Sequence, residues 1–103
     1  MVKQIGEQEF SEVLNSEIAV VDFFATWCGP CKMLGPVLEQ LSAGYEGKIN
    51  FFKIDVDEAE ETAAKYGIQS IPAVFAFKKG ELFSKQVGYN GRDGVKDFLD
   101  SLL

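Results

Sequence analysis

The sequence predicts an α/β fold, in which a central mixed sheet is covered by helices on both faces. Apolar runs of strand length alternate along the chain with stretches whose apolar residues recur at helical spacing. Helices that connect successive strands require crossovers, so the first strands are expected to be parallel. Near the C-terminus, two strands are separated only by a short turn, which predicts an antiparallel hairpin.

Three elements are expected before the only two cysteines of the chain. Residues 2–5 are expected to form a short edge strand, and residues 7–14 a helix. The buried face of that helix is marked by residues at i, i+3, i+4 spacing: Phe10, Val13 and Leu14. Residues 18–25 are apolar on both alternating faces, which is typical of a central strand covered on both sides.

A long helix is expected after the cysteines, ending near Gly44 and Gly47. Pro36 lies inside this helix and should bend it, because proline removes a backbone donor. The buried face is marked by five residues at helical spacing: Leu34, Val37, Leu38, Leu41 and Tyr45. The next strand is expected over residues 49–56.

An acidic run at residues 57–61 follows this strand. Carboxylates suit the dipole in the first turn of a helix, so the run predicts a helix, which Gly67 would end. Capping and solvation explain these acidic residues in full, and no catalytic role is predicted for them.

The last elements are strands over residues 73–77 and 82–87, joined by a turn at residues 78–81. Asn90, followed three residues later by Asp93, is expected to cap a final helix. The buried stripe of that helix consists of Val95, Phe98, Leu99 and Leu102. The complete order is βαβαβαββα.

The composition excludes several classes of function. The chain lacks histidine, which removes Cys–His and Ser–His–Asp catalysis and the commonest metal ligand. The formal net charge is −6 and no basic cluster is longer than Lys78-Lys79, so nucleic acid would be repelled. The apolar runs are too short to span a membrane, and the N-terminus lacks the apolar segment of a signal peptide. These features predict one cytoplasmic domain over residues 1–103, monomeric and without a nucleic-acid or membrane partner.

Cys28 and Cys31 lie three positions apart. As a structural disulfide, the pair would close a very short loop, worth roughly 2 kcal/mol against about 3 kcal/mol for a fifteen-residue loop. As a metal site, it would lack two of the four ligands that structural zinc requires. Both uses stay open but explain the pair poorly. A redox-active pair is the better interpretation, and it needs no metal or other cofactor.

The spacing of the two cysteines suits reversible oxidation. Residues three apart on a helical turn share one face, so the pair can close a disulfide with little backbone movement. Pro30 fits the first helical position, which places Cys28 immediately before the helix, where free amides and the dipole favour a thiolate. Cys31 is expected to be less accessible. Cys28 is therefore predicted to attack a disulfide of another molecule, and Cys31 to resolve the mixed disulfide.

The motif WCGPCK, preceded by VVDFFAT and followed by a helix with Pro36, closely resembles the thioredoxin family. The likeness runs the length of the chain, through KIDVD, YGIQSIPAVFAFKKG and VGYNG. It implies the thioredoxin fold, with a central five-stranded mixed sheet flanked by four helices. It also implies a general protein disulfide reductase, an electron carrier that a thioredoxin reductase recharges.

The resemblance also assigns residues around the cysteines. The other motif residues are Trp27, Gly29 and Pro30. Pro72 matches a proline with a cis peptide bond that faces the cysteines, and Ile71 would offer its backbone to an extended client segment. Gly88 matches a glycine near the same surface. Trp27 is expected to contact substrate, although the residue alone leaves open whether its indole shields the sulfurs or takes no part in the chemistry.

Asp22 lies within an apolar strand, where an ionised carboxylate would cost several kcal/mol without a partner. Burial should raise its pKa and suit it to carrying a proton; the alternative is an aspartate at a strand end that reaches water. The resemblance implies that Asp22 lies beneath the cysteines and assists deprotonation of Cys31. Lys53 matches a lysine near that aspartate, and its alternative is a surface lysine whose stem packs on apolar residues.

Two positions depart from the family pattern. Phe24 replaces a frequent second tryptophan, and Ala73 replaces a common threonine. Both changes could shift which clients bind, and neither disturbs the sulfur chemistry.

Two other functions stay open. A binding module would use the apolar surface expected from Trp27, Ile71, Pro72 and Tyr89. An oxidant or isomerase would run the same exchange in the opposite direction. The Gly29-Pro30 pair resembles reducing members of the family, and the lack of a signal peptide agrees with a reducing compartment.

Overall fold

The computed structural model describes all 103 residues and contains five strands, four α-helices and two 3₁₀ helices. In chain order these are β1 (Val2–Ile5), η1 (Glu7–Glu9), α1 (Ser11–Leu14), β2 (Ile18–Phe24), α2 (Gly29–Ser42), η2 (Ala43–Tyr45), β3 (Asn50–Asp55), α3 (Glu60–Lys65), β4 (Ala73–Lys78), β5 (Glu81–Val87) and α4 (Arg92–Asp100). The predicted α/β fold and the predicted order of strands and helices are confirmed.

The strands form one five-stranded mixed sheet in the order β1-β3-β2-β4-β5. Strands β1 and β2 pair in parallel with β3, whereas β4 runs antiparallel to both β2 and β5. The hairpin between β4 and β5 turns at Lys79 and Gly80, both of which have positive φ, as a two-residue turn of this kind requires. Strand β2 therefore occupies the centre of the sheet and leads directly into the cysteine motif.

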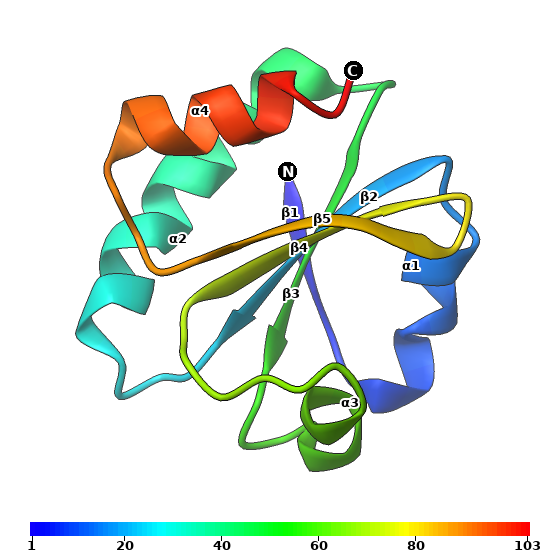
Figure 1. Cartoon of the computed structure of the whole chain (residues 1–103), viewed down its shortest axis with the longest axis vertical. Helices are drawn as coiled ribbons and strands as arrows, with labels where there is room; N and C mark the ends of the chain where they lie inside the picture. Colours follow the sequence, from blue (N-terminus) through cyan, green and yellow to red (C-terminus); the bar gives the residue numbers. More distant parts are fainter.

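Helices cover both faces of the sheet, with α2 and α4 on one side and α1 and α3 on the other (Figure 1). Successive residues of a strand point to opposite faces. Val20 therefore packs in the core under α2 and α4, while Val21 and Phe23 pack in the core under α1 and α3. The same alternation places Asp22 on the α2 face of the sheet, beneath the start of that helix.

Two predicted helices begin differently from expectation. The helix expected over residues 7–14 consists of two short pieces, η1 and α1. The helix expected from the acidic run begins only at Glu60, because the preceding residues form a turn around Asp55. In that turn, the Asp57 N–H donates to Oδ1 of Asp55 and the Glu58 N–H donates to its carbonyl oxygen.

Gly67 ends α3 as predicted. Its N–H donates to the carbonyl oxygen of Ala64, and the Ile68 N–H donates to that of Ala63. This pair of bonds is the Schellman arrangement at a helix end.

The predicted cap of the last helix is wrong. The residue at the N-cap of α4 is Gly91, without a side-chain hydrogen bond to the helix. The Asn90 side chain instead fills the space beside Gly94, where a Cβ would collide with it. The predicted buried stripe of α4 is confirmed, since Val95, Phe98, Leu99 and Leu102 are all buried.

Helix α3 receives its N-terminal cap from the distant residue Glu7. Ala59, at the N-cap, has no side chain that could accept a hydrogen bond from the helix. Oε2 of Glu7 accepts from the backbone N–H of Thr62 at 2.7 Å and from its hydroxyl at 2.8 Å. The carboxylate also lies at the positive end of the helix dipole.

Glu7→Ala should therefore lower the free energy of unfolding by about 1–2 kcal/mol, as the loss of a helix cap does. Glu7→Gln should lower it less, because it keeps an acceptor oxygen. Urea denaturation measures both effects, with Glu46→Ala as the control, since Glu46 is exposed and has no hydrogen-bond partner. Equal midpoints for the Glu7→Ala and Glu46→Ala variants would contradict the capping role.

Candidate active site

The cysteine motif begins where the central strand ends. Strand β2 ends at Phe24, and α2 begins at Gly29 with Cys28 as its N-cap residue. The carbonyl oxygen of Cys28 accepts from the Lys32 N–H at 3.2 Å, which opens the helix. Pro30 is the second residue of the helix, one position later than predicted, and its missing N–H would have no helical partner there either. The predicted position of Cys28 immediately before the helix is confirmed.

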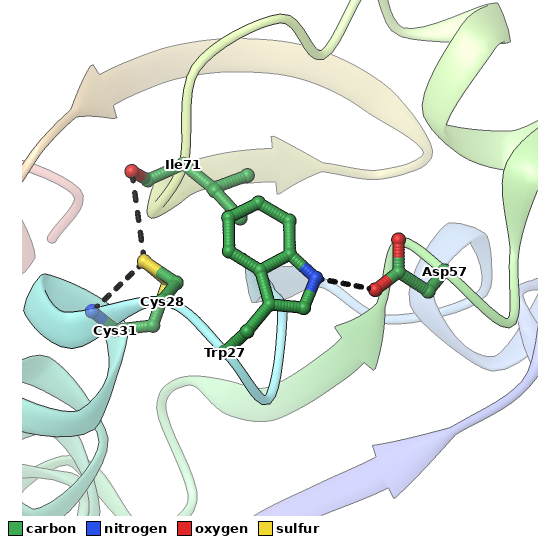
Figure 2. Close-up of a disulfide and its surroundings, with 5 residues drawn as sticks. All are labelled: Trp27, Cys28, Cys31, Asp57 and Ile71. Carbon is green, nitrogen blue, oxygen red and sulfur yellow. Dashed lines mark hydrogen bonds between the residues drawn. A yellow bond between two sulfur atoms is a disulfide. The ribbon is translucent and has the colours of Figure 1, made fainter.

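Cys28 and Cys31 form a disulfide with their Cα atoms 5.3 Å apart. The backbone N–H of Cys31 points at Sγ of Cys28 over 3.2 Å. Sγ of Cys28 also lies 3.9 Å from the carbonyl oxygen of Ile71, on the side of the sulfur away from the helix (Figure 2). The first sulfur therefore meets a backbone donor and a backbone acceptor, on opposite sides.

The expected difference in exposure between the cysteines is very small in the disulfide form. Cys28 is 6% exposed and Cys31 is 5% exposed. Both sulfurs lie in a small apolar cluster with Ala25, against which Val56 and Ile71 pack. The two cysteines differ instead in their neighbours, since Cys28 caps the helix and Cys31 lies within it.

Trp27 is 68% exposed, so most of its side chain faces solvent. Its indole N–H donates to Oδ2 of Asp57 at 2.7 Å, on the side away from Ile71 (Figure 2). Sequence reasoning missed Asp57, because capping and solvation accounted for the whole acidic run. One available signal was topology: β2 and β3 are adjacent and parallel, so the residues after each strand meet at the same sheet edge.

Ile71, Pro72 and Gly88 lie together on the far side of the disulfide from α2. The Ile71–Pro72 peptide bond is cis, as the resemblance implied. The Gly88 N–H donates to the carbonyl oxygen of Pro72 at 2.7 Å. Gly88 has φ of 86°, a conformation that residues with a side chain rarely adopt. Pro72 is buried, whereas Ile71 is half-buried and Trp27 is exposed.

Asp22 is 2% exposed, which excludes the alternative of an aspartate that reaches water. Its Oδ1 is buried without a hydrogen-bond partner. Burial raises the pKa of the Asp22 carboxyl to about 7, although the positive charge of Lys53 opposes the rise. Asp22, Cys31 and Lys53 line one cavity of about 300 Å³ behind the disulfide, together with Pro36 and five other residues.

Lys53 is half-buried and lies beside Asp22, its register partner across β2 and β3. Its ammonium group lies 5.7 Å from the ring centre of Phe24. Phe24, the first departure from the family pattern, is half-buried and packs against the cysteine cluster. Ala73, the second, is buried in the core under α1 and α3.

Comparison with known proteins agrees with this geometry. The family model named Thioredoxin matches residues 1–101. Curated proteins named thioredoxin from Staphylococcus aureus strains Mu50, MW2 and COL are each 45% identical over 102 residues, which cover 99% of this chain and 98% of the relative. The chain belongs to the thioredoxin family.

This thioredoxin-family protein is a protein-disulfide oxidoreductase, and the Cys28–Cys31 pair is at the distance that dithiol–disulfide exchange requires. Proteins of this family use a redox-active disulfide instead of a prosthetic group. Membership implies interaction with a thioredoxin reductase and with disulfide-bearing substrates. The predicted family and chemistry are confirmed.

Two features are absent from the thioredoxin-family structure. It brings no three metal-ligating side chains close enough together to hold an ion. None of its helices has the length and hydropathy needed to cross a membrane.

Proposed function

We propose that this thioredoxin-family protein reduces disulfides in a broad range of proteins, with Cys28 as the attacking thiolate and Cys31 as the resolving thiol. The thiolate of Cys28 attacks one sulfur of the client disulfide, which forms a mixed disulfide and releases the first client thiolate. The thiolate of Cys31 then attacks Sγ of Cys28 and releases the second. The client gains two electrons and two protons, and a thioredoxin reductase restores the dithiol.

The observation that carries this assignment is the N–H of Cys31 directed at Sγ of Cys28 over 3.2 Å. A hydrogen bond to the charged form favours a thiolate over a thiol, and the N-terminus of α2 adds a positive potential. Cys31 lies inside the helix and has no equivalent donor among the hydrogen bonds of the structure. Sγ of Cys28 is therefore more easily ionised, which suits it to attack the client disulfide. Sγ of Cys31 is better suited to the later step that resolves the mixed disulfide.

Asp22 is the proposed proton acceptor for Cys31. The two side chains line the same cavity, and the pKa of Asp22 near 7 allows it to take and release a proton around neutral pH. Lys53 lines the same cavity, and its positive charge favours the ionised form of the Asp22 carboxyl. Its proposed part is to support proton transfer by Asp22.

Trp27, Ile71, Pro72 and Gly88 are the proposed client surface. The backbone of Ile71 is near the attacking sulfur, so an extended client segment that paired with it would bring its own disulfide to Cys28. The hydrogen bond from the Gly88 N–H to the carbonyl oxygen of Pro72 helps to fix the backbone at Ile71 and Pro72.

We also propose that residues 1–103 act as one domain and as a monomer in the reducing cytoplasm. The acidic net charge of −6 and the Gly29-Pro30 pair between the cysteines support this proposal. The same charge argues against nucleic acid or an anionic membrane surface as a partner.

The test is the turbidity that develops when insulin is reduced by dithiothreitol. The protein should accelerate it, and a Cys28→Ser variant should not. A rate equal to that of dithiothreitol alone would reject the reductase. A cellular role that survives replacement of both cysteines by serine would instead indicate a binding module. The redox potential, followed through Trp27 fluorescence, distinguishes a reductase from an oxidant or isomerase.

A further inference from the structure

We propose that Lys85 is a specificity-determining residue, which selects client segments that carry an acidic side chain on one flank of their reactive cysteine. The proposal rests on the reductase function proposed above and names a class of client for it. The carboxylate of the client enters a pocket that lies beside the Ile71–Pro72 segment, and Lys85 forms part of its wall.

The first step concerns the pocket itself. It has a volume of about 200 Å³ and shares no residue with the cavity behind the disulfide. One wall is the segment 67–70, which leads directly to Ile71. The other wall consists of residues from β4 and β5: Ala73, Phe75, Lys85 and Val87. Small-molecule pockets usually measure about 300–1,000 Å³, so this pocket suits a single side chain.

The second step concerns the charge of the pocket. Lys85 is the only charged residue among the eight that line it. Its ammonium group lies 5.7 Å from the ring centre of Phe75 in the pocket wall, and it belongs to none of the ion pairs of the structure. Gln69 and Ser70, which are exposed on the opposite wall, carry N–H and O–H donors. The pocket therefore offers a cation and two neutral donors to a carboxylate of another molecule.

The third step concerns the reach of a client that reacts with Cys28. Sγ of Cys28 lies 3.9 Å from the carbonyl oxygen of Ile71, and the preceding residue, Ser70, already lines the pocket. An extended segment advances about 3.3 Å per residue, so a side chain within three residues of the client cysteine can reach the pocket. Because an extended segment has a direction, only one flank of the client cysteine passes Lys85.

The fourth step concerns the charges elsewhere around the site. Trp27 bonds to Asp57 on the side away from Ile71, where Glu58 is also exposed (Figure 2). The whole protein has a net charge of −6. These negative charges disfavour an acidic client segment, so a preference for an acidic residue on one flank requires a local cation.

The experiment uses peptides whose single cysteine is joined by a disulfide to nitrothiobenzoate, a coloured thiol. It measures the second-order rate constant with which the reduced protein releases this thiol. The peptides carry Glu, Gln or Lys at each of the three positions before and after the cysteine. On one flank, the Glu peptide should react about threefold faster than the Gln peptide, as expected for one exposed ion pair. On the other flank, the Glu peptide should react no faster.

The variants test whether Lys85 causes this preference. Lys85→Gln should lower the ratio of the Glu rate to the Gln rate to about one, and Lys85→Glu should make the Lys peptide react faster than the Glu peptide. Lys48→Gln is the matched control, because it removes the same charge from an exposed lysine that lines a different pocket. It should keep the threefold ratio. A ratio within each variant cancels any general change in reactivity or folding.

A ratio near one at every position for the unmodified protein would overturn the proposal. So would equal losses of preference in Lys85→Gln and Lys48→Gln, since the preference would then follow the net charge. Failure of the unmodified protein to release the coloured thiol from any peptide would instead reject the reductase function. Fluorescence anisotropy of dye-labelled Glu and Gln peptides tests the pocket in that case. Tighter binding of the Glu peptide that Lys85→Gln abolishes would support the pocket, and equal affinities would overturn it.

Discussion

Cys31→Ser should convert the protein from a catalyst into a trap for its clients. Cys28 keeps the N–H of residue 31 and its position at the start of α2, so its attack on a client disulfide should proceed. The serine hydroxyl cannot resolve the mixed disulfide, which therefore accumulates. Turnover of insulin should fall by about three orders of magnitude or more. Non-reducing electrophoresis and mass spectrometry should show one client joined to Cys28.

Cys28→Ser is the matched control for the trap. It should also lose turnover, but it should not form the covalent complex, because Cys31 lies inside the helix and lines the cavity behind the disulfide. Trapping by Cys28→Ser but not by Cys31→Ser would reverse the two roles. Trapping by neither variant would contradict the mixed-disulfide mechanism.

Asp22→Asn should make the oxidised protein more stable than the unmodified protein at pH 8, but not at pH 4. Burial raises the pKa of Asp22 from its ordinary value of 3.8 to about 7. Between these values, the folded chain keeps a proton that the unfolded chain releases. The stability of the unmodified protein therefore falls as pH rises through this range, and the loss is complete above pH 7. The full difference corresponds to about 4 kcal/mol. The asparagine side chain is neutral over the whole pH range, so the stability of the Asp22→Asn variant should not fall in this way as pH rises.

The measurement is urea denaturation of both proteins in the disulfide form from pH 4 to pH 8. The asparagine amide has its own cost of burial, so the decisive quantity is the change with pH and not the absolute gain. Lys53→Met extends the test, because Lys53 lowers the pKa of Asp22 and its removal should move the loss to higher pH. Parallel stability curves for the unmodified protein and Asp22→Asn would contradict a buried, proton-holding carboxyl.

The reducing activity of Asp22→Asn should fall at neutral pH although the protein is more stable. The proposed proton acceptor for Cys31 is missing, so resolution of the mixed disulfide should become the slow step. Stability and activity then change in opposite directions, which separates a functional role of Asp22 from a role in folding.

Much of the fold could be predicted because its signals are local. Strand β2 is apolar on both faces, which indicated a central strand, and the structure places it between β3 and β4. Helical spacing of apolar residues identified α2 and α4. The placement of Cys28 before a helix followed from a single property of Pro30, the lack of an N–H.

The remaining features did not follow from the local patterns. Asn90 has the chemistry of a cap, yet its side chain is packed beside Gly94, four positions away. The other features depend on distant residues. Helix α3 is capped by Glu7, which is 55 positions from Thr62. The equal burial of Cys28 and Cys31 arises because Val56 and Ile71, from other parts of the chain, cover the disulfide.

The amino-acid order alone was sufficient to establish the α/β architecture, the redox pair and the unusual position of Asp22, because periodicity, proline chemistry and charge in an apolar strand act over a few neighbouring residues. Only the folded chain decided which groups surround those sulfurs. The meeting of Trp27 with Asp57, and of Asp22 with Cys31 and Lys53 in one cavity, depends on the parallel pairing of β2 with β3 and on the helix packed above them. These contacts join residues far apart in sequence, and they form only when the packing of the whole core brings the strands and the helix together.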